Sequence, residues 1–276
     1  KYLDNEFIVC GNSFNKYDFL SDTSNINLSM DDNILLPKTS NKYLNKYIRK
    51  RHDSSGGVNV GNKISSKNIY YQQFIPGKTY SISFITTKNK SHILGFNQLF
   101  IIKDNIEYPY LHAGAITLGL KNSNYQNFKK WINNISDTYN IKGYCSIDFK
   151  IYGNKVFILD INPRLSASYR MYTRKYNSLM KYHCDLTDAN LKINNYKYYS
   201  YIFLYAKNEL QVDKSINNIK DISDRPQIGE IIKKNMPILT LNITSHNKDN
   251  LLKKIKNRIK SAMKIIDCYN IELEYE

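Results

Sequence analysis

Two acidic residues and an asparagine in the middle of the chain have the chemistry and spacing of a metal site. The run Gly153–Lys155 predicts a three-residue hairpin loop, and the strands on its two sides then place Asp148 directly opposite Asp160. Asn162 lies two residues beyond Asp160, so it projects from the same face of the hairpin. Opposed carboxylates with Cβ atoms about 4.5–5.5 Å apart repel each other unless a proton or a cation offsets their charge. Magnesium prefers oxygen ligands of this kind, and the alternative is two solvated carboxylates at an exposed strand end.

The other face of this hairpin is wholly apolar, so we expect it to pack into the core. An arginine, Arg164, follows Pro163 directly after the second strand. Its guanidinium could bind a phosphoryl oxygen through paired hydrogen bonds, or it could act as a counter-ion for Asp160, and the two roles are compatible. The side chains expected in the core are Ile147, Phe149, Ile151, Phe157, Leu159 and Ile161.

A lysine and a glycine-rich loop upstream of the hairpin predict a second element for binding anions. Lys50 ends the strand-like run Tyr47–Lys50, and the loop Arg51–Gly57 follows it. Backbone N–H groups of such a loop can surround an anion, because glycine adopts the necessary dihedral angles without steric cost. Taken alone, a loop of this composition is also compatible with a plain turn. The residues assigned to it are Ser54, Ser55, Gly56 and Gly57.

These elements together resemble the ATP-grasp family of ligases. The run Asp160–Arg164 is similar to the family signature (E/D)-x-N-P-R, and Asp148 has the place of the acidic residue on the preceding strand. Lys50 resembles the lysine that reaches the ATP phosphates, and the glycine-rich loop resembles the mobile lid that covers them. Arg51 stands where the family usually has proline. This departure could loosen the start of the lid, but it leaves Lys50 in place.

The segment Tyr71–Gly77 resembles the hinge of the same family, whose backbone groups bind adenine. Gln73 stands where the family more often has glutamate. A strand that ends in a Pro-Gly turn is the alternative interpretation of this segment. The adenine-binding residues that the resemblance implies are Gln72, Gln73, Phe74 and Ile75.

The resemblance implies an α+β ATP-grasp fold in which two α+β subdomains clasp ATP. Residues 1–33 are expected to be the remnant of an N-terminal domain and a connection. Residues 34–76 are expected to form the lid subdomain, and residues 77–276 the core subdomain with the carboxylate hairpin.

The implied reaction joins a carboxylate to an amine through an acyl phosphate, with ATP and Mg²⁺ as cofactors and Mn²⁺ as a possible substitute for Mg²⁺. In this reaction Lys50 and Arg164 act on the transferred phosphoryl group, and the metal ligands are Asp148, Asp160 and Asn162. The loop Asp53–Gly57 is expected to be mobile without nucleotide and protected with it.

A subgroup of the family, which includes tyramine–L-glutamate ligase of methanofuran biosynthesis, shares further motifs with the chain. The subgroup implies glutamate as the acid and a small aromatic amine such as tyramine. Arg170 and Arg174 lie four residues apart on a predicted helix, Ser168–His183, and are candidates to bind a second substrate carboxylate. The alternative is that both are solvated surface residues. The shared motifs are Gly95–Gln98, His112–Ala115, Asn162–Ser168 and Asp224–Gly229.

Hydrophobic periodicity predicts a mixed α+β chain in which short strands position these residues. Strands are expected at Tyr47–Lys50, Val58–Val60, Ile69–Phe74, Tyr80–Thr86, His92–Phe100, Cys145–Tyr152, Val156–Asn162, Tyr198–Ala206 and Ile238–Ile243. Helices are expected at Asn124–Tyr139, Ser168–His183 and Asn247–Ile266.

Composition leaves one alternative class of function open. The chain has 276 residues, a net charge of +16 and 24 tyrosines, which are also features of a basic protein that binds nucleic acid or another anion. Its lysines are scattered, however, and no nucleic-acid-binding motif accompanies them. A further alternative, an ATP-grasp domain without activity, is disfavoured because the residues that carry the resemblance are intact.

The remaining features exclude other classes of protein. No apolar run approaches the ~20 residues of a membrane span, and no signal peptide is visible, so a cytoplasmic location is expected. A homodimer is possible. The four cysteines contain no C-x-x-C pair, which argues against a zinc site and a disulfide framework; they are Cys10, Cys145, Cys184 and Cys268.

Overall fold

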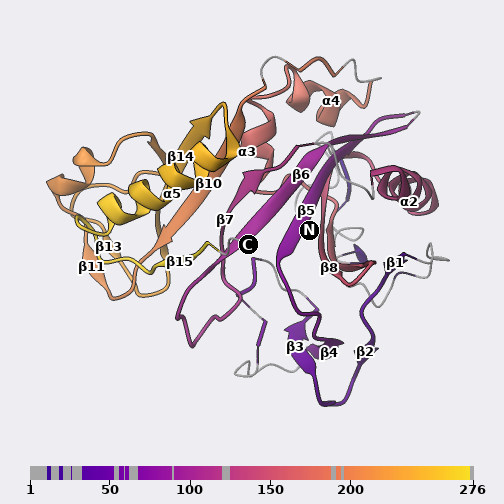
Figure 1. Cartoon of the computed structure of the whole chain (residues 1–276), viewed down its shortest axis with the longest axis horizontal. Coiled ribbons are helices and arrows are strands. Elements are labelled where there is room, and N and C mark those ends of the chain that lie inside the picture. Colours follow the sequence, from indigo (N-terminus) through magenta and orange to yellow (C-terminus); the bar gives the residue numbers. More distant parts are fainter. Residues whose placement is uncertain are drawn as a thin grey trace. The chain divides into compact units, whose positions relative to one another are not determined.

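The chain forms two compact units (Figure 1). The first comprises residues 1–53, 65–97 and 119–195, and the second comprises residues 54–64, 98–118 and 196–276. This division follows contacts between residues, and the subdomain boundaries expected from the sequence stay a prediction. The computed structural model describes residues 11–13, 19–20, 26, 33–52, 56–58, 60–61, 68–88, 90–119, 125–187, 191–193 and 196–273.

The sheet of the first unit has the strand order β1-β9-β8-β5-β6. Strand β1 (Ile34–Leu35) is parallel to β9 (Lys155–Asn162). Strands β9, β8 (Gly143–Tyr152) and β5 (Thr79–Thr86) are antiparallel neighbours. Strand β6 (Ser91–Ile102) begins in the first unit and continues into the second.

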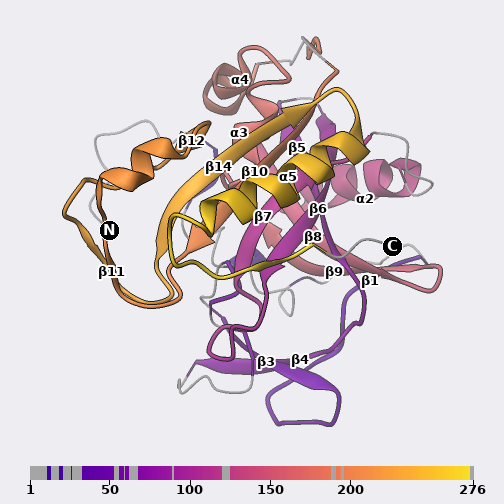
Figure 2. The ribbon, with the colours of Figure 1, turned by 60° about the vertical axis from the view of Figure 1, so that its left-hand side comes forward.

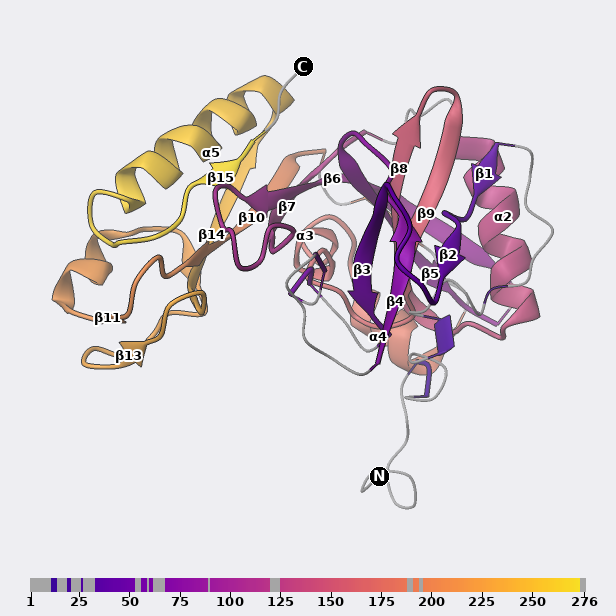
Figure 3. The same cartoon turned by 90° about the horizontal axis from the view of Figure 1, so that it is seen from below.

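Helix α2 (Tyr125–Thr138) covers one face of this sheet. The ring centroid of Phe128 lies 4.8 Å from that of Phe149 on β8 and 5.6 Å from that of Phe96 on β6. Figure 3 shows the helix beside the β8–β9 hairpin. Because successive residues of a strand alternate between faces, Asp148 projects from the opposite face, away from α2.

The described residues of the first unit also form a small sheet and two short helices that follow the carboxylate hairpin. The small sheet has the order β2-β4-β3, with strands at Thr39–Ser40, Ile69–Gln73 and Tyr47–Arg51. The helices are α3 (Tyr169–Tyr172) and α4 (Leu179–Asp185). A second buried cluster joins them to β5, β6 and β8; it contains Ile85, Leu94, Tyr144, Tyr172, Tyr176 and Leu179.

The single helix predicted for Ser168–His183 is wrong, because the chain leaves the helical conformation between α3 and α4. Ser178 has a left-handed φ of 57°, and Tyr176 forms a bridge with Ile193 instead of continuing a helix. Arg170 is half-buried within α3, whereas Arg174 is exposed and lies beyond its end. The two arginines therefore do not share one helical face.

The sheet of the second unit has the strand order β7 (His112–Thr117), β10 (Tyr198–Tyr205), β14 (Pro237–Ser245) and β12 (Ile222–Ser223). Helix α5 (Lys248–Ala262) lies along β10 and β14 (Figure 2) and buries Leu251, Ile255 and Ile259 in the core of this unit. The Asn247 side chain accepts hydrogen bonds from two backbone N–H groups of the first turn, which explains why the helix begins there. Strands β11 (Leu210–Gln211) and β13 (Ile231–Ile232) form a separate two-stranded sheet, and β15 (Ile271–Glu272) pairs with the part of β6 that belongs to this unit. The 3-10 helix η2 lies at Lys214–Asn218.

Several expected elements differ from the observed ones. The last helix ends at Ala262, four residues before the expected Ile266, because the chain forms a turn there. Val58 lies in a turn and Val60 forms only an isolated bridge, while Asn59 lies outside the described residues. Of the described helices, none is long and apolar enough to cross a membrane. Among the residues that the structure describes, Cys145, Cys184 and Cys268 form no disulfide.

Candidate functional site

The β8–β9 hairpin places Asp148 directly opposite Asp160, so the predicted opposition of the two carboxylates is confirmed. The predicted three-residue loop is wrong, since Tyr152 pairs with Lys155 across a two-residue loop. The register then shifts by one residue between Asp148 and Phe149 through a β-bulge. The shorter loop and the bulge offset each other, and the carboxylates meet as expected.

The bulge also changes which side chains of β9 enter the core. Val156 and Ile158 are buried, while Phe157 and Leu159 are only half-buried, so the expected apolar face is wrong at those two positions. Leu159 is the additional residue of the bulge, opposite the step from Asp148 to Phe149. At the other positions of the hairpin, the buried face agrees with expectation at Ile147, Phe149 and Ile161, whereas Ile151 is half-buried.

Burial and mutual repulsion make the carboxylate pair costly to ionise. Burial, followed by the charge of Asp160, raises the pKa of Asp148 to about 8, although Arg164 and Lys50 act against this rise. Burial likewise raises the pKa of Asp160. The Oδ1 atom of Asp160 is buried and has no hydrogen-bond partner among the described residues. A proton on a carboxylate or a bound cation would lower both the cost of burying the charges and the repulsion between them.

A chain of hydrogen bonds connects Arg164 to this carboxylate pair. The Nη2 of Arg164 donates to the Oδ1 of Asn162 at 3.1 Å, and its Nη1 donates to the carbonyl oxygen of Leu165 at 3.3 Å. The Nδ2 of Asn162 in turn donates to the Oδ2 of Asp160 at 3.3 Å. The structure therefore brings Asp148, Asp160, Asn162 and Arg164 together, as the sequence predicted.

Lys50 on β3 joins the same cluster. Its Nζ donates to the carbonyl oxygen of Leu159, at the bulge, over 3.2 Å and to the Oε1 of Gln72 over 3.5 Å. Burial alone would lower the pKa of Lys50, but Tyr70 and the two carboxylates outweigh it, so the pKa is raised and the ammonium is charged. Sequence reasoning missed Tyr70 and the Leu159 carbonyl. Antiparallel pairing of the two strand-like runs would have revealed Tyr70, which lies directly opposite Lys50.

The hinge residues lie at the end of β4 in the first unit. The N–H of Phe74 donates to the carbonyl oxygen of Lys46 at 2.8 Å, so this donor is already used. The Oε1 of Gln73 accepts from the backbone N–H of Lys38 at 3.3 Å. Ile75 is buried, and the ring of Phe74 is exposed. Gln72 contacts Lys50, and the adenine-binding role of these residues stays a prediction.

The glycine-rich loop is described only at its second half, since Ser54 and Ser55 lie outside the described residues. Gly56 and Gly57 have left-handed φ values of 65° and 76° in the second unit. The carbonyl oxygen of Gly56 accepts from the N–H of His112 at 2.9 Å. A Cβ atom on Gly57 would lie 1.8 Å from the carbonyl oxygen of Tyr110, so only glycine fits there.

Alanine substitutions at these two glycines are expected to have unequal effects. Gly57→Ala adds a clash with the Tyr110 carbonyl to the backbone strain, and it should displace the loop at a cost of about 2–3 kcal/mol. Gly56→Ala is the matched control, because its φ is similar but nothing lies within 4 Å of the added Cβ atom. Hydrogen exchange should accelerate at the His112 amide only in Gly57→Ala. Equal exchange in the two variants would refute this account of the loop.

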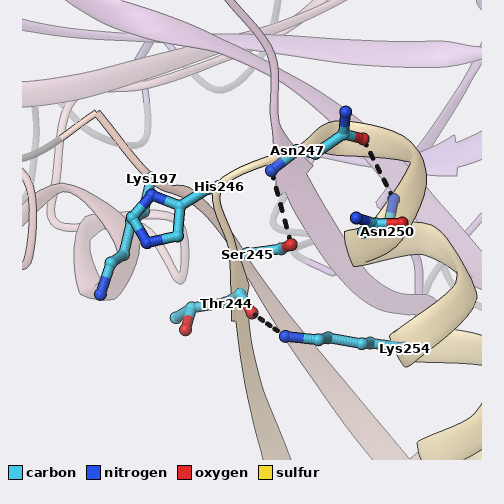
Figure 4. A pocket seen from close by; sticks show the side chains of 7 residues that line it. All are labelled: Lys197, Thr244, Ser245, His246, Asn247, Asn250 and Lys254. Carbon is cyan, nitrogen blue, oxygen red and sulfur yellow. Dashed lines mark hydrogen bonds between the residues drawn. The ribbon is translucent and has the colours of Figure 1, made fainter.

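A pocket of about 320 Å³ lies elsewhere, at the N-terminus of α5 (Figure 4). None of its lining residues was predicted to act in function. Its Asn247 side chain caps the helix, the N–H of Asn247 donates to the Oγ of Ser245, and the Nζ of Lys254 donates to the carbonyl oxygen of Thr244. These contacts serve the local structure, and we assign the pocket no role.

Comparison with known proteins matches this chain to a domain family and to a relative that has a named activity. The model of the ATP-grasp domain matches residues 10–168. Tyramine–L-glutamate ligase of Methanocaldococcus jannaschii is 28% identical over 141 residues, which cover 51% of this chain. The alignments with this ligase and with an uncharacterized protein of the same organism each span 42% of the relative's length.

Solved structures with a similar fold include enzymes of different activities. The L-amino acid ligase of Bacillus licheniformis has a TM-score of 0.62 and 10% identity, covering 82% of this chain and 67% of that one. The biotin carboxylase domain of Hydrogenobacter thermophilus 2-oxoglutarate carboxylase, in complex with MgADP, ADP and bicarbonate, has a TM-score of 0.55 and 10% identity. It covers 84% of this chain and 59% of that one. At these identities the likeness shows a shared fold alone.

Proposed function

Since this chain belongs to the ATP-grasp family and has the α+β fold of that family, we propose that it uses ATP to join a carboxylate to an amine. The observation that carries the proposal is the opposed, half-buried pair Asp148 and Asp160 with two cations beside it, Lys50 and Arg164. Two carboxylates that face each other at this degree of burial cost free energy unless a cation or a proton offsets their charge. They are suited to a bound cation and a polyphosphate.

The residues present fit a magnesium ion. Asp148, Asp160 and Asn162 offer hard oxygen ligands, and the Oδ1 of Asp160 has no partner among the residues described. The described part of the chain contains no cluster of three or more His, Cys, Asp or Glu side chains, so the Asn162 amide oxygen would have to serve as the third protein ligand. Arg164 now donates to that oxygen and would have to release or share it. When bound, magnesium would neutralise charge on the ATP phosphates.

The protein side chains would act mainly by position and charge. In the proposed reaction a substrate carboxylate oxygen attacks the γ-phosphorus of ATP, the bond to the ADP oxygen breaks, and an acyl phosphate forms. Lys50 and Arg164 offset the negative charge on the transferred phosphoryl oxygens. The amine nitrogen then attacks the acyl carbon, phosphate leaves, and the nitrogen loses a proton. The glycine-rich loop would exclude water, which would otherwise hydrolyse the acyl phosphate.

We further propose glutamate as the acid and tyramine as the amine. The support is the relative that is named tyramine–L-glutamate ligase, together with the motifs shared with its subgroup. The net charge of +16 favours an acid that carries two carboxylates. Arg170, which is half-buried in α3, is the better candidate for the second carboxylate, because Arg174 is exposed beyond the helix.

Nucleotide binding is the first expected result. Magnesium with ATP or ADP should raise the unfolding temperature, because a ligand at 100 times its Kd adds about 2.7 kcal/mol to the free energy of unfolding. The measurement is a thermal unfolding scan with nucleotide, with magnesium, and with both. Stabilisation by RNA instead of MgATP would support the basic, anion-binding alternative.

Measurements of ADP formation test the choice of substrates separately from the ligase activity itself. ADP should form from ATP with glutamate plus tyramine and should fall to background when either is omitted. A preference for another acid and amine would remove the proposed substrates and keep the ligase. ADP formation with bicarbonate alone would point to a carboxylase of the same fold. The absence of ADP formation with every acid would contradict the proposed function.

A further inference from the structure

A buried group of hydroxyl and amide side chains lies on the carboxylate face of the first unit's sheet. Ser83 on β5, Tyr144 on β8 and Asn97 on β6 are all fully buried. The hydroxyl of Tyr144 donates to the Oγ of Ser83 at 2.9 Å, and the Nδ2 of Asn97 donates to the same oxygen at 3.3 Å. Ser83 lies opposite Ser146, which lies opposite Asn162, so the group shares the sheet face of the proposed metal ligands.

This group holds the chain segment that follows the Asn-Pro-Arg run. The Oγ of Ser168 lies 2.8 Å from the hydroxyl of Tyr144 and 3.1 Å from the Oγ of Ser83. The Oγ of Ser166 lies 2.8 Å from the Oγ of Ser168. Arg164 therefore lies between two segments that hydrogen bonds hold in place: Asn162 at the end of β9, and Ser166 with Ser168 after it.

A second hydrogen bond fixes the helix that comes next. The hydroxyl of Tyr172 on α3 donates to the Oδ1 of Asn97 at 2.9 Å. Glycine at position 95 makes room for this bond, because a Cβ atom there would lie 2.6 Å from the Tyr172 hydroxyl. The segment is thus tied to the sheet on both sides of its entry into α3.

Stability alone does not account for so many buried polar groups. Apolar side chains could fill the same volume without the cost of desolvating hydroxyl and amide groups. A fully hydrogen-bonded network does, however, impose one orientation on the segments that it joins. Burial raises the pKa of Tyr144 to about 12, so its hydroxyl stays protonated and can donate at ordinary pH. A guanidinium that binds a phosphoryl oxygen must be held to within about 0.5 Å.

We propose that Ser83, Tyr144 and Ser168 form a positioning network that holds Arg164 in place for the γ-phosphoryl group of ATP. The inference rests on the proposed function, and it assigns these three residues no contact with substrate. Their effect on the phosphoryl group passes through the backbone between Asn162 and Ser168.

The test compares two nucleotides that differ at the γ-phosphoryl group. Tyr144→Phe removes the central hydroxyl and keeps the ring. Calorimetric titration with magnesium and AMPPNP should show roughly tenfold weaker binding than wild type, whereas binding of magnesium and ADP should change by less than about twofold. In an Arg164→Ala background, Tyr144→Phe should cause no further loss, because the residue through which it acts is absent.

Tyr176→Phe is the matched control, because the buried hydroxyl of Tyr176 donates to the carbonyl oxygen of Leu94 at 2.8 Å, outside the network. It should leave both affinities unchanged. Ser168→Ala gives the same test by a smaller change if Tyr144→Phe fails to fold. Equal losses for AMPPNP and ADP, or a further loss beside Arg164→Ala, would overturn the positioning role. Wild-type protein that binds neither nucleotide would overturn the proposed function itself.

Discussion

Asp160→Asn is expected to reduce magnesium-dependent ATP turnover by roughly a thousandfold or more while leaving the metal-free fold intact. The substitution removes the carboxylate whose Oδ1 has no hydrogen-bond partner in the described part of the chain. It keeps the shape of the side chain and an acceptor for the hydrogen bond from Asn162. The measurement is ADP formation with the best acid and amine found for wild type. Full activity in the variant would refute the metal assignment.

The same variant should be more stable than wild type in metal-free alkaline solution. The pKa of Asp148 is raised from 3.8 to about 8 by burial and by the charge of Asp160, so the folded protein retains a proton that the unfolded chain releases. That contribution is fully present below about pH 4 and is lost as the pH rises through about 8. Asp160→Asn removes one of the two repelling charges. Unfolding scans without magnesium should therefore show little difference at about pH 4 and a higher unfolding temperature for the variant at about pH 9. A variant that is less stable at the higher pH would contradict the repulsion argument.

The opposition of the carboxylates was predictable from the sequence, but for a reason that was partly wrong. The expected loop was one residue too long, and the bulge at Leu159 restored the register that this loop implied. Alternation therefore placed Asp148, Asp160 and Asn162 on one face correctly and misplaced Phe157. A bulge depends on how a strand twists within its sheet, and no pattern of side chains in β9 indicates it.

Contacts made by backbone atoms explain most of what the sequence did not predict. Lys50 donates to the carbonyl oxygen of Leu159, a group that every residue type carries. Similarly, the hydroxyl of Tyr176 donates to the carbonyl oxygen of Leu94, and this contact helps to hold the turn that separates α3 from α4. Apolar spacing alone favoured one continuous helix there. The ATP-grasp fold itself was predictable, because its signature residues are close together in the sequence.

Lys50→Met is expected to reduce ATP turnover by at least about a hundredfold, because it removes a cation from the proposed phosphoryl site. The methionine side chain has a similar length and is apolar, so it can occupy the buried position. Lys155→Met is the matched control, since Lys155 is an exposed lysine on β9 and its loss changes the net charge equally. Retention of turnover in Lys50→Met would contradict the assigned role of Lys50.

The stability of this variant should change in the direction opposite to that of Asp160→Asn. Lys50 lowers the pKa of both Asp148 and Asp160, so its removal leaves the buried charges with less compensation. The raised pKa of Lys50 keeps the ammonium charged at the pH where the carboxylates ionise, so its contribution is intact there. Without magnesium, Lys50→Met should therefore unfold at a lower temperature than wild type at about pH 9, with a smaller difference at about pH 4. In the double variant Lys50→Met/Asp160→Asn the two shifts should partly cancel, because one buried charge of each sign is removed. Shifts of the same sign in the two single variants would show that the lysine and the carboxylates do not interact as the structure indicates.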